Sequence, residues 1–316
     1  MTLTLLVDNL LSAPVIAFVV AVIATLARFD LRLPDALPPI LSAYLLFAIG
    51  LKGGRSLSES SLSDLVLPVI IAVAIGVATP IVAWLVMRSF VKLSNVDAAG
   101  IAAHYGSVSA VTFVVVLATL DAQGMFYEGF VAGLLAILEV VGIVVGLALA
   151  RSAGSNLKDV LSEVTRGKSI AILLAGIVIG AAVGDARLAA TDPLFVGLFT
   201  GALTLFLLEM GRLAGERLKD VAQAGWRLIA AAIVLPIVNG AIGAGLGAVS
   251  GLSTGGIAVL ATLAASASYI AAPAAVRIAL PEANPALSIS TALGVTFPFN
   301  ITLGIPLYIA LAQWLS

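Results

Sequence analysis

The sequence predicts an all-α polytopic membrane protein, with ten transmembrane helices in two five-helix repeats of opposite orientation. Three observations carry this prediction. Of 316 residues, 61% are hydrophobic and only 10% are charged; the mean hydropathy is +1.17; and short motifs recur in the same order in both halves. Soluble domains carry about 25% charged residues. Ten helices of about 21 residues, each crossing about 30 Å of hydrocarbon, use most of such a chain.

Ten apolar runs mark the expected spans, and all should be helices because open strands would leave backbone groups unpaired in lipid. The runs cover residues 9–27, 38–51, 66–87, 98–119, 127–150, 168–184, 194–214, 226–248, 255–276 and 287–314. They predict a first repeat at 1–152, a cytoplasmic linker at 153–167 and an inverted second repeat at 168–316.

The basic residues predict the orientation of these spans. With the N-terminus outside, thirteen Lys and Arg residues fall in the inner loops, and only Lys52, Arg55 and Arg187 fall in the outer loops. Loops rich in Lys and Arg stay in the cytoplasm. We therefore expect a multi-pass protein of the plasma (inner) membrane with both termini outside.

The two halves share motifs at an offset of about 155 to 162 residues. The matches are Asp30-Leu31-Arg32-Leu33 with Asp185-Ala186-Arg187-Leu188, Gly50 and Gly54 with Gly211 and Gly215, Pro80-Ile81-Val82 with Pro236-Ile237-Val238, Ser107-Val108-Ser109 with Ser266-Ala267-Ser268, and Gly142-Ile143 with Gly304-Ile305. Since five spans are an odd number, the second copy must enter the membrane from the opposite side. Inverted repeats are typical of secondary transporters with a midplane site. A duplicated scaffold without transport is the alternative.

Spans four and nine are predicted to be interrupted near mid-membrane. Each places small hydroxyl residues beside a helix breaker, Gly106 in one case and Pro273 in the other. A broken helix offers free N–H groups and about half a positive charge to an anion. Close packing of small residues between helices is the alternative. Because no Lys or Arg cage accompanies them, the motifs favour a small monovalent anion with a cation such as Na+.

Four other polar residues within apolar spans are candidates for function. Glu139 and Glu209 are costly charges in a membrane; Glu209 either pairs with Arg212 or coordinates Na+. Glu139 aligns within one residue of Asn300 and has a functional or a helix-bridging role. His104 is the only histidine, and either titrates or is a hydrogen-bonded core residue.

Residues 104–113 (HYGSVSAVTF) and 299–308 (FNITLGIPLY), together with Glu209-Met210-Gly211, resemble the sodium-dependent bicarbonate transporter family of the SbtA type. The resemblance implies a Na+-coupled symporter that imports bicarbonate by alternating access through a 5+5 inverted fold. Core spans two to four and seven to nine would move against gate spans one, five, six and ten. It also implies a homotrimer and a PII-like cytoplasmic regulator, although the central loop is shorter than expected for the family.

Carried onto this sequence, the resemblance gives a bicarbonate site at Gly106, Ser107, Val108, Ser109, Ser266, Ala267 and Ser268. Na+, the coupling ion, is assigned to Thr262, Glu209 and Thr112, and no other cofactor is expected. The nearest alternative is Na+-coupled transport of another small monovalent anion or a carboxylate. A membrane sensor or scaffold is the second alternative. An enzyme is disfavoured because no nucleophile–base pair or metal cluster occurs in the sequence, and nothing points to nucleic acid.

Overall fold

The computed structural model describes residues 3–57, 61–150, 157–183, 185–223 and 225–316. Within these ranges every regular element is a helix and no strand occurs, which confirms the all-α prediction. Residues 153–156 of the predicted linker, and Arg151 before them, lie outside the described residues. The rest of the linker holds a short helix, α8 (Leu157–Thr165).

A helix or a group of helices lies at each of the ten predicted spans. The first half contains α1 (Leu3–Leu10), α2 (Ala13–Leu26), α3 (Leu37–Leu57), α4 (Leu62–Val86), η1 (Met87–Val91), α5 (Asn95–Gly106), α6 (Ala110–Ala122) and α7 (Val131–Ala148). The second half contains α9 (Lys168–Val183), α10 (Asp185–Leu188), η2 (Ala189–Thr191), η3 (Pro193–Gly197), α11 (Phe199–Gln223), α12 (Trp226–Val249), α13 (Thr254–Ala265), α14 (Ala272–Ala279), α15 (Pro285–Thr291), η4 (Ala292–Thr296), α16 (Phe297–Phe299), η5 (Asn300–Gly304) and α17 (Ile305–Leu315).

Six of these helical segments in the described part of the chain are long and apolar enough to cross a membrane. Helices α1 and α2, bent by 65°, make a seventh if they count as one span. Helices α9 and α13 are apolar but shorter. The chain is therefore a multi-pass membrane protein, and its full count of ten spans stays a prediction.

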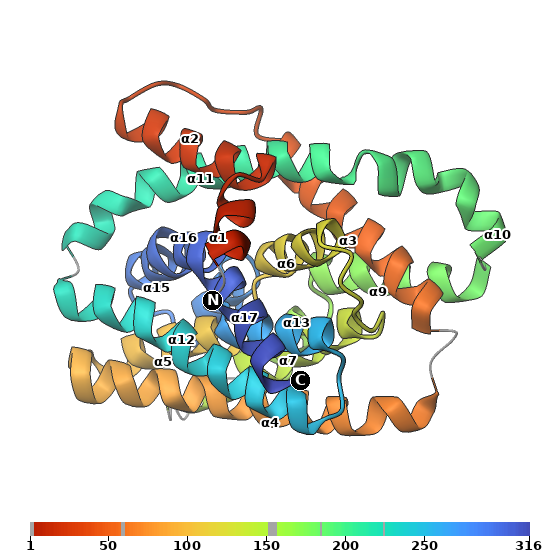
Figure 1. The fold of residues 1–316 in the computed structure, drawn as a ribbon. Coiled ribbons are helices and arrows are strands. Elements are labelled where there is room, and N and C mark those ends of the chain that lie inside the picture. The colour runs from red at the N-terminus through yellow and green to blue at the C-terminus, as the bar shows by residue number, and fades with distance from the viewer. Residues whose placement is uncertain (1–2, 58–60, 151–156, 184, 224) are drawn as a thin grey trace.

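The helices divide into two packed groups (Figure 1). In the first, called here the four-helix layer, α3 packs along α9 and α2 packs along α11. In the second, the central body, α4, α5 and α7 pack together, α6, α12 and α17 pack on α13, and α14 packs on α5 and α7. The expected division was wrong for spans two, five and seven. Spans two and seven lie in the four-helix layer with one and six, and span five lies in the central body. Span ten is divided, because α17 packs on α13 whereas α15 and η4 pack on α11.

Glycines explain this grouping. Gly50 and Gly54 of α3 face Gly176 and Gly180 of α9 so closely that an added Cβ at Gly54 would lie 2.1 Å from the Ile177 carbonyl oxygen. Gly211 and Gly215 of α11 lie in the same way against Phe18 and Thr25 of α2. Small residues four apart let two membrane helices approach at backbone distance. The repeated glycines of spans two and seven are thus the contacts that join them to spans six and one.

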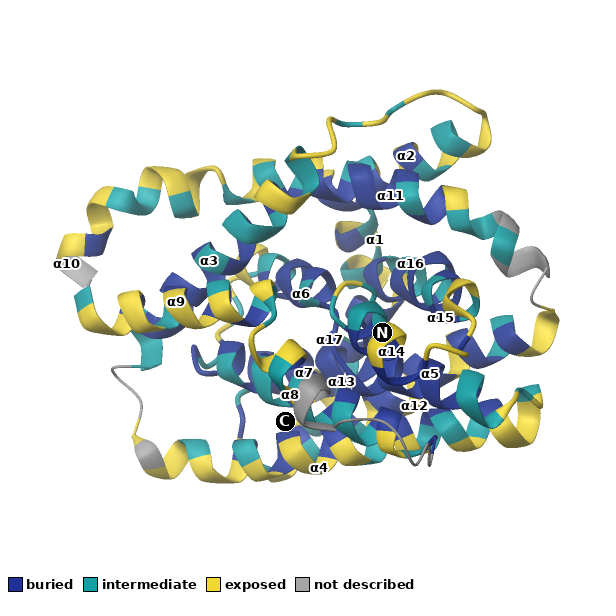
Figure 2. Ribbon diagram, turned by 180° about the vertical axis from the view of Figure 1, so that it is seen from behind, coloured by how far each residue is buried: buried dark blue, intermediate teal, exposed yellow. Residues whose placement is uncertain are grey.

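The deepest part of the molecule is α5 and α13, the first helices of spans four and nine. All residues of α13 from Gly255 to Ala265 are buried, as are those of α5 from Ala98 to Gly106. Figure 2 shows the buried residues gathered around these helices and the exposed ones on the outer faces of α4 and α9. Exposed residues of α4 such as Val66 and Ile70 are large and apolar. Such an apolar outer surface suits contact with lipid.

Candidate functional site

Spans four and nine are both interrupted, and their first halves have matching ends. Helix α5 begins at Ser94 and α13 at Ser253, and each serine oxygen accepts a backbone N–H three residues later. Both helices stop at a serine in extended conformation: Ser107 has φ −83° and ψ 166°, and Ser266 has φ −83° and ψ 164°. A chain that leaves the helix in this way frees the last carbonyl groups and the first amides of the next helix.

The two breaks lie against each other. The Ser109 amide donates to the Ser266 hydroxyl over 2.9 Å, and the Ser268 amide donates to the His104 carbonyl over 2.8 Å. The structure therefore brings together both Ser-x-Ser motifs, including Gly106, Val108 and Ala267 within or beside the breaks. Polar backbone from two separate spans meets at one place inside the central body.

His104 takes part in this contact through its ring. It is buried, and its Nδ1 lies 2.6 Å from the Ser268 carbonyl oxygen. A carbonyl oxygen only accepts, so Nδ1 carries the hydrogen and donates. The geometry is that of a hydrogen-bonded core histidine that fastens the second break to the first, the second of the two roles expected for this residue.

Not all the serines are used in the same way. Ser266 Oγ also donates to the Leu263 carbonyl, and Ser109 Oγ accepts from the Thr112 amide over 3.1 Å. In contrast, the buried Ser107 Oγ and Thr112 Oγ1 have no hydrogen-bond partner in the described part of the chain. Because buried hydroxyls without a partner are costly, these two oxygens are suited to meet a ligand.

A small cavity of about 10 Å³ opens at the breaks. Its lining comes from the start of α6, the turn before α14, α7 and α9, namely Val108, Ser109, Ala110, Glu139, Ser169, Ser268, Tyr269, Ile270 and Ala271. This volume is about that of one water molecule. Ser169 belongs to the four-helix layer and the other lining residues to the central body, so the cavity lies at the boundary between the two groups.

A second cavity of about 320 Å³ shares Ser169, Tyr269 and Ile270 with the first. Its remaining lining comes mostly from the four-helix layer and includes Lys168 and Leu213. Lys168 lies on the side of the membrane where the basic residues are predicted to be cytoplasmic. The site at the breaks therefore adjoins open volume toward that predicted inner side.

The residues expected to hold Na+ are not gathered at this cavity. Thr262 Oγ1 donates to the Ala258 carbonyl within α13, and neither Thr262 nor Glu209 lines the cavity. Both Glu209 carboxylate oxygens accept hydrogen bonds from Arg212, at 2.6 to 3.1 Å. The arrangement of Glu209 is that of a buried ion pair, in the other helix group.

Asn300 and Glu139, which were aligned within one residue of each other in the sequence, have different surroundings. The Asn300 amide donates to the carbonyl of Ala265, the last residue of α13, over 3.0 Å, and its oxygen accepts from the Tyr308 hydroxyl. Asn300 is thus a helix-bridging residue. Glu139 is 3% exposed and faces the cavity.

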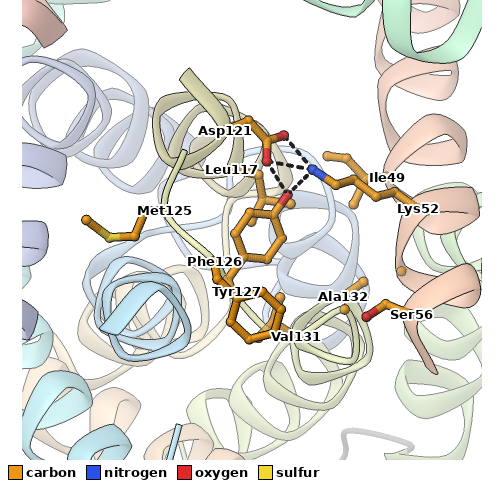
Figure 3. Close-up of a pocket in the computed structure, with 12 residues that line it drawn as sticks. Ile49, Lys52, Ser56, Leu117, Asp121, Met125, Phe126, Tyr127, Val131 and Ala132 are labelled. Atoms are coloured by element: carbon orange, nitrogen blue, oxygen red, sulfur yellow. Dashed lines mark hydrogen bonds and ion pairs between the residues drawn. The ribbon is translucent and has the colours of Figure 1, made fainter. Parts of the chain in front are cut away.

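Near the predicted outer side, Lys52 of α3 reaches Asp121 at the end of α6 (Figure 3). Its Nζ lies 2.6 Å from each Asp121 carboxylate oxygen and 2.7 Å from the Tyr127 hydroxyl. These residues line two cavities of about 220 and 380 Å³. Lys52 therefore links the four-helix layer to the central body at this end.

Sequence reasoning missed several of these residues. Lys52 was expected only to reach the aqueous surface, because its partner Asp121 is 69 positions away. Ser169 follows Lys168 at the start of a span and carries no motif. Asn239, directly after the repeated Pro-Ile-Val motif, is fully buried, and its amide atoms have no partner among the described residues. Its place within an apolar span was the only available signal.

Comparison with known proteins gives one positive result. The family model described as the Na+-dependent bicarbonate transporter superfamily matches residues 13–313 of the chain. A search of curated individual proteins found no significant match. The matched region includes both breaks, Glu139 and both helix groups.

Proposed function

Because the chain belongs to the Na+-dependent bicarbonate transporter superfamily, we propose that it is a symporter that imports bicarbonate with Na+ across the plasma membrane. The proposal rests on one structural observation, the meeting of the two helix breaks at a single buried cavity. Beside this cavity, backbone N–H groups at the start of α6 are donors for an anion, whereas the Ala271 and Ala272 amides at the start of α14 already donate to Ser268 Oγ. The proposed bicarbonate site comprises Gly106, Ser107, Val108, Ser109, Ser266, Ala267 and Ser268.

The chemistry of the site suits a small monovalent anion. No Lys or Arg lines the cavity among the described residues, so a multiply charged anion would lack neutralising charge. Ser107 Oγ and Thr112 Oγ1 at the first break have no protein partner among the described residues; neither lines the cavity at its present size, and each is able to donate to one oxygen of bicarbonate once the cavity widens toward it. Bicarbonate is larger than a water molecule, so the cavity must widen to admit it.

Alternating access follows from the two helix groups. The cavity lies where the four-helix layer meets the central body, with larger cavities toward each predicted membrane side. We propose that the layer moves against the body, opening the breaks to one side at a time. The matched ends of α5 and α13 support a 5+5 inverted repeat, and the basic residues of the predicted inner loops support both termini outside. A homotrimer and a PII-like regulator are proposed on the family resemblance alone.

Uptake into proteoliposomes tests this function. Purified protein in vesicles without Na+ should accumulate labelled bicarbonate when an inward Na+ gradient is applied, and an equal K+ gradient should give no accumulation. Unlabelled acetate and lactate added in excess test the alternative substrates. Uptake that ignores the Na+ gradient, or that a small carboxylate suppresses more strongly than bicarbonate does, contradicts the proposal.

A further inference from the structure

Glu139 is a buried carboxyl group without a protein partner. It is 3% exposed, and its carboxyl group makes no hydrogen bond or ion pair with any other described residue. A carboxylate in such a place is strongly unfavourable unless something neutralises it. Asn300, which aligns within one residue of it in the second half, has partners for both its amide nitrogen and its oxygen. The packing of the fold therefore does not by itself account for Glu139.

The Glu139 side chain faces the cavity at the two helix breaks. Four other polar residues line the same cavity, namely Ser109, Ser169, Ser268 and Tyr269. Hydroxyl, carboxylate and unwound backbone carbonyl oxygens are the ligands with which broken membrane helices coordinate Na+. The cavity thus combines oxygen ligands for a cation with the helix starts that attract an anion.

The charges of this cavity explain why both ions are needed. A bound bicarbonate and an ionised Glu139 are like charges within one small space of low dielectric, where their repulsion is large. No Lys or Arg among the described residues lines the cavity to offset it. One cation between them removes most of the repulsion, and each anion then strengthens binding of that cation.

We infer that Glu139 is a ligand of the coupling Na+, which binds between its carboxylate and the transported anion. This inference rests on the proposed bicarbonate site and names the residue that makes anion binding depend on Na+. The Ser109 hydroxyl, which accepts one amide hydrogen bond, and the Ser169 hydroxyl complete the coordination from the cavity lining, whereas the Ser268 hydroxyl already accepts from the Ala271 and Ala272 amides. The ion pair of Glu209 with Arg212 then belongs to the structure of the four-helix layer and has no part in coupling.

The first experiment measures Na+ binding without transport. Thermal unfolding of the purified full chain is followed in NaCl and in KCl at equal ionic strength. We expect Na+ to raise the unfolding midpoint of the wild type and of Glu282→Gln, which alters an exposed carboxylate that lines neither cavity at the breaks. Glu139→Gln should lose the Na+-specific rise. If Glu139→Gln keeps the rise, the inference is wrong.

The second experiment measures coupling in proteoliposomes. Coupling between two ligands typically changes affinity by about 5- to 150-fold. Lowering Na+ should therefore raise the KM for bicarbonate at least about fivefold in the wild type, and less than about twofold in Glu139→Gln, whose neutral amide does not repel the anion. A purely structural role would lower the amount of active protein and leave the Na+ dependence of KM unchanged.

Glu139→Asp covers the case in which the glutamine variant does not fold. Its carboxylate is retained but lies one methylene further from the cavity, so half-maximal stabilisation should require more Na+. A folded Glu139→Asp with the wild-type Na+ response overturns direct ligation. Suppose that Na+ raises the unfolding midpoint of the wild type but not that of Glu139→Gln, and that the wild type never takes up bicarbonate. The proposed substrate then fails while the Na+ site stands.

Discussion

The Ser109 amide donates a hydrogen bond to the Ser266 hydroxyl over 2.9 Å, and this bond joins the interrupted crossings of the two halves. Replacing Ser266 with Ala leaves a buried amide without its acceptor, at a cost of about 1–3 kcal/mol. We expect a lower unfolding midpoint together with slower bicarbonate uptake. Ser89→Ala is the control, because that exposed hydroxyl bonds only to its own helix at Leu85.

Ser107 should behave differently from Ser266. Its buried hydroxyl has no partner among the described residues, so Ser107→Ala breaks no bond in the protein. We expect an unchanged unfolding midpoint and a KM for bicarbonate raised about fivefold or more, since a charge-assisted hydrogen bond is worth about 1.5–3 kcal/mol. The midpoint and the KM are measured on the same preparation. A destabilised variant with unaltered KM would place the anion elsewhere.

Glycine 142 tests the packing that holds the first break in position. A Cβ added there would lie 1.7 Å from the Gly106 carbonyl oxygen, and relieving that overlap must displace α5 from α7. Gly142→Ala should abolish transport and destabilise the protein by at least about 1–3 kcal/mol. Gly133→Ala, in the same helix, meets no atom within 4 Å. That variant should transport normally and be slightly more stable.

The Lys52–Asp121 ion pair should affect movement more than stability. Both side chains are about half exposed, and such pairs contribute about 0–1 kcal/mol. Because the pair links the two helix groups, Asp121→Asn should favour separation of the four-helix layer from the central body at the predicted outer side. The native sequence has no cysteine, so a single Ala118→Cys in the adjoining cavity reports this directly. An impermeant thiol reagent should modify it faster when Asp121 is neutral; an equal rate in both backgrounds contradicts the prediction.

The sequence was most informative where a local pattern determines a local structure. The small hydroxyl residues beside Gly106 and before Pro273 predicted the two breaks, because few side chains there favour a continuous helix. The two motifs meet in the Ser109–Ser266 contact, in agreement with the single site expected from both. Loop charges and hydropathy predicted a polytopic helical chain without any knowledge of packing.

Contacts between helices that are far apart in the sequence could not be predicted from it. Glycines at 50 and 54 were recognised as a repeat, but their partners at 176 and 180 were not, and spans two and seven were therefore assigned to the wrong group. For Glu209 the sequence left an ion pair and Na+ coordination both open, and the bidentate contact with Arg212 is the ion pair. The π-helical turns η4 and η5 in span ten depend on tertiary contacts such as that of Asn300 with Ala265.

The packing of helices from one half on helices from the other has a consequence for biosynthesis. Helix α3 packs on α9 and α2 packs on α11, so each pair in the four-helix layer joins a segment from one half to a segment from the other. During translation, α2 and α3 must remain in the bilayer without these partners until the second half has been inserted. The order of assembly is therefore fixed: helices of the central body from the first half can associate early, whereas the layer is completed only late in synthesis. Neither half, made alone, would contain either helix pair of the four-helix layer.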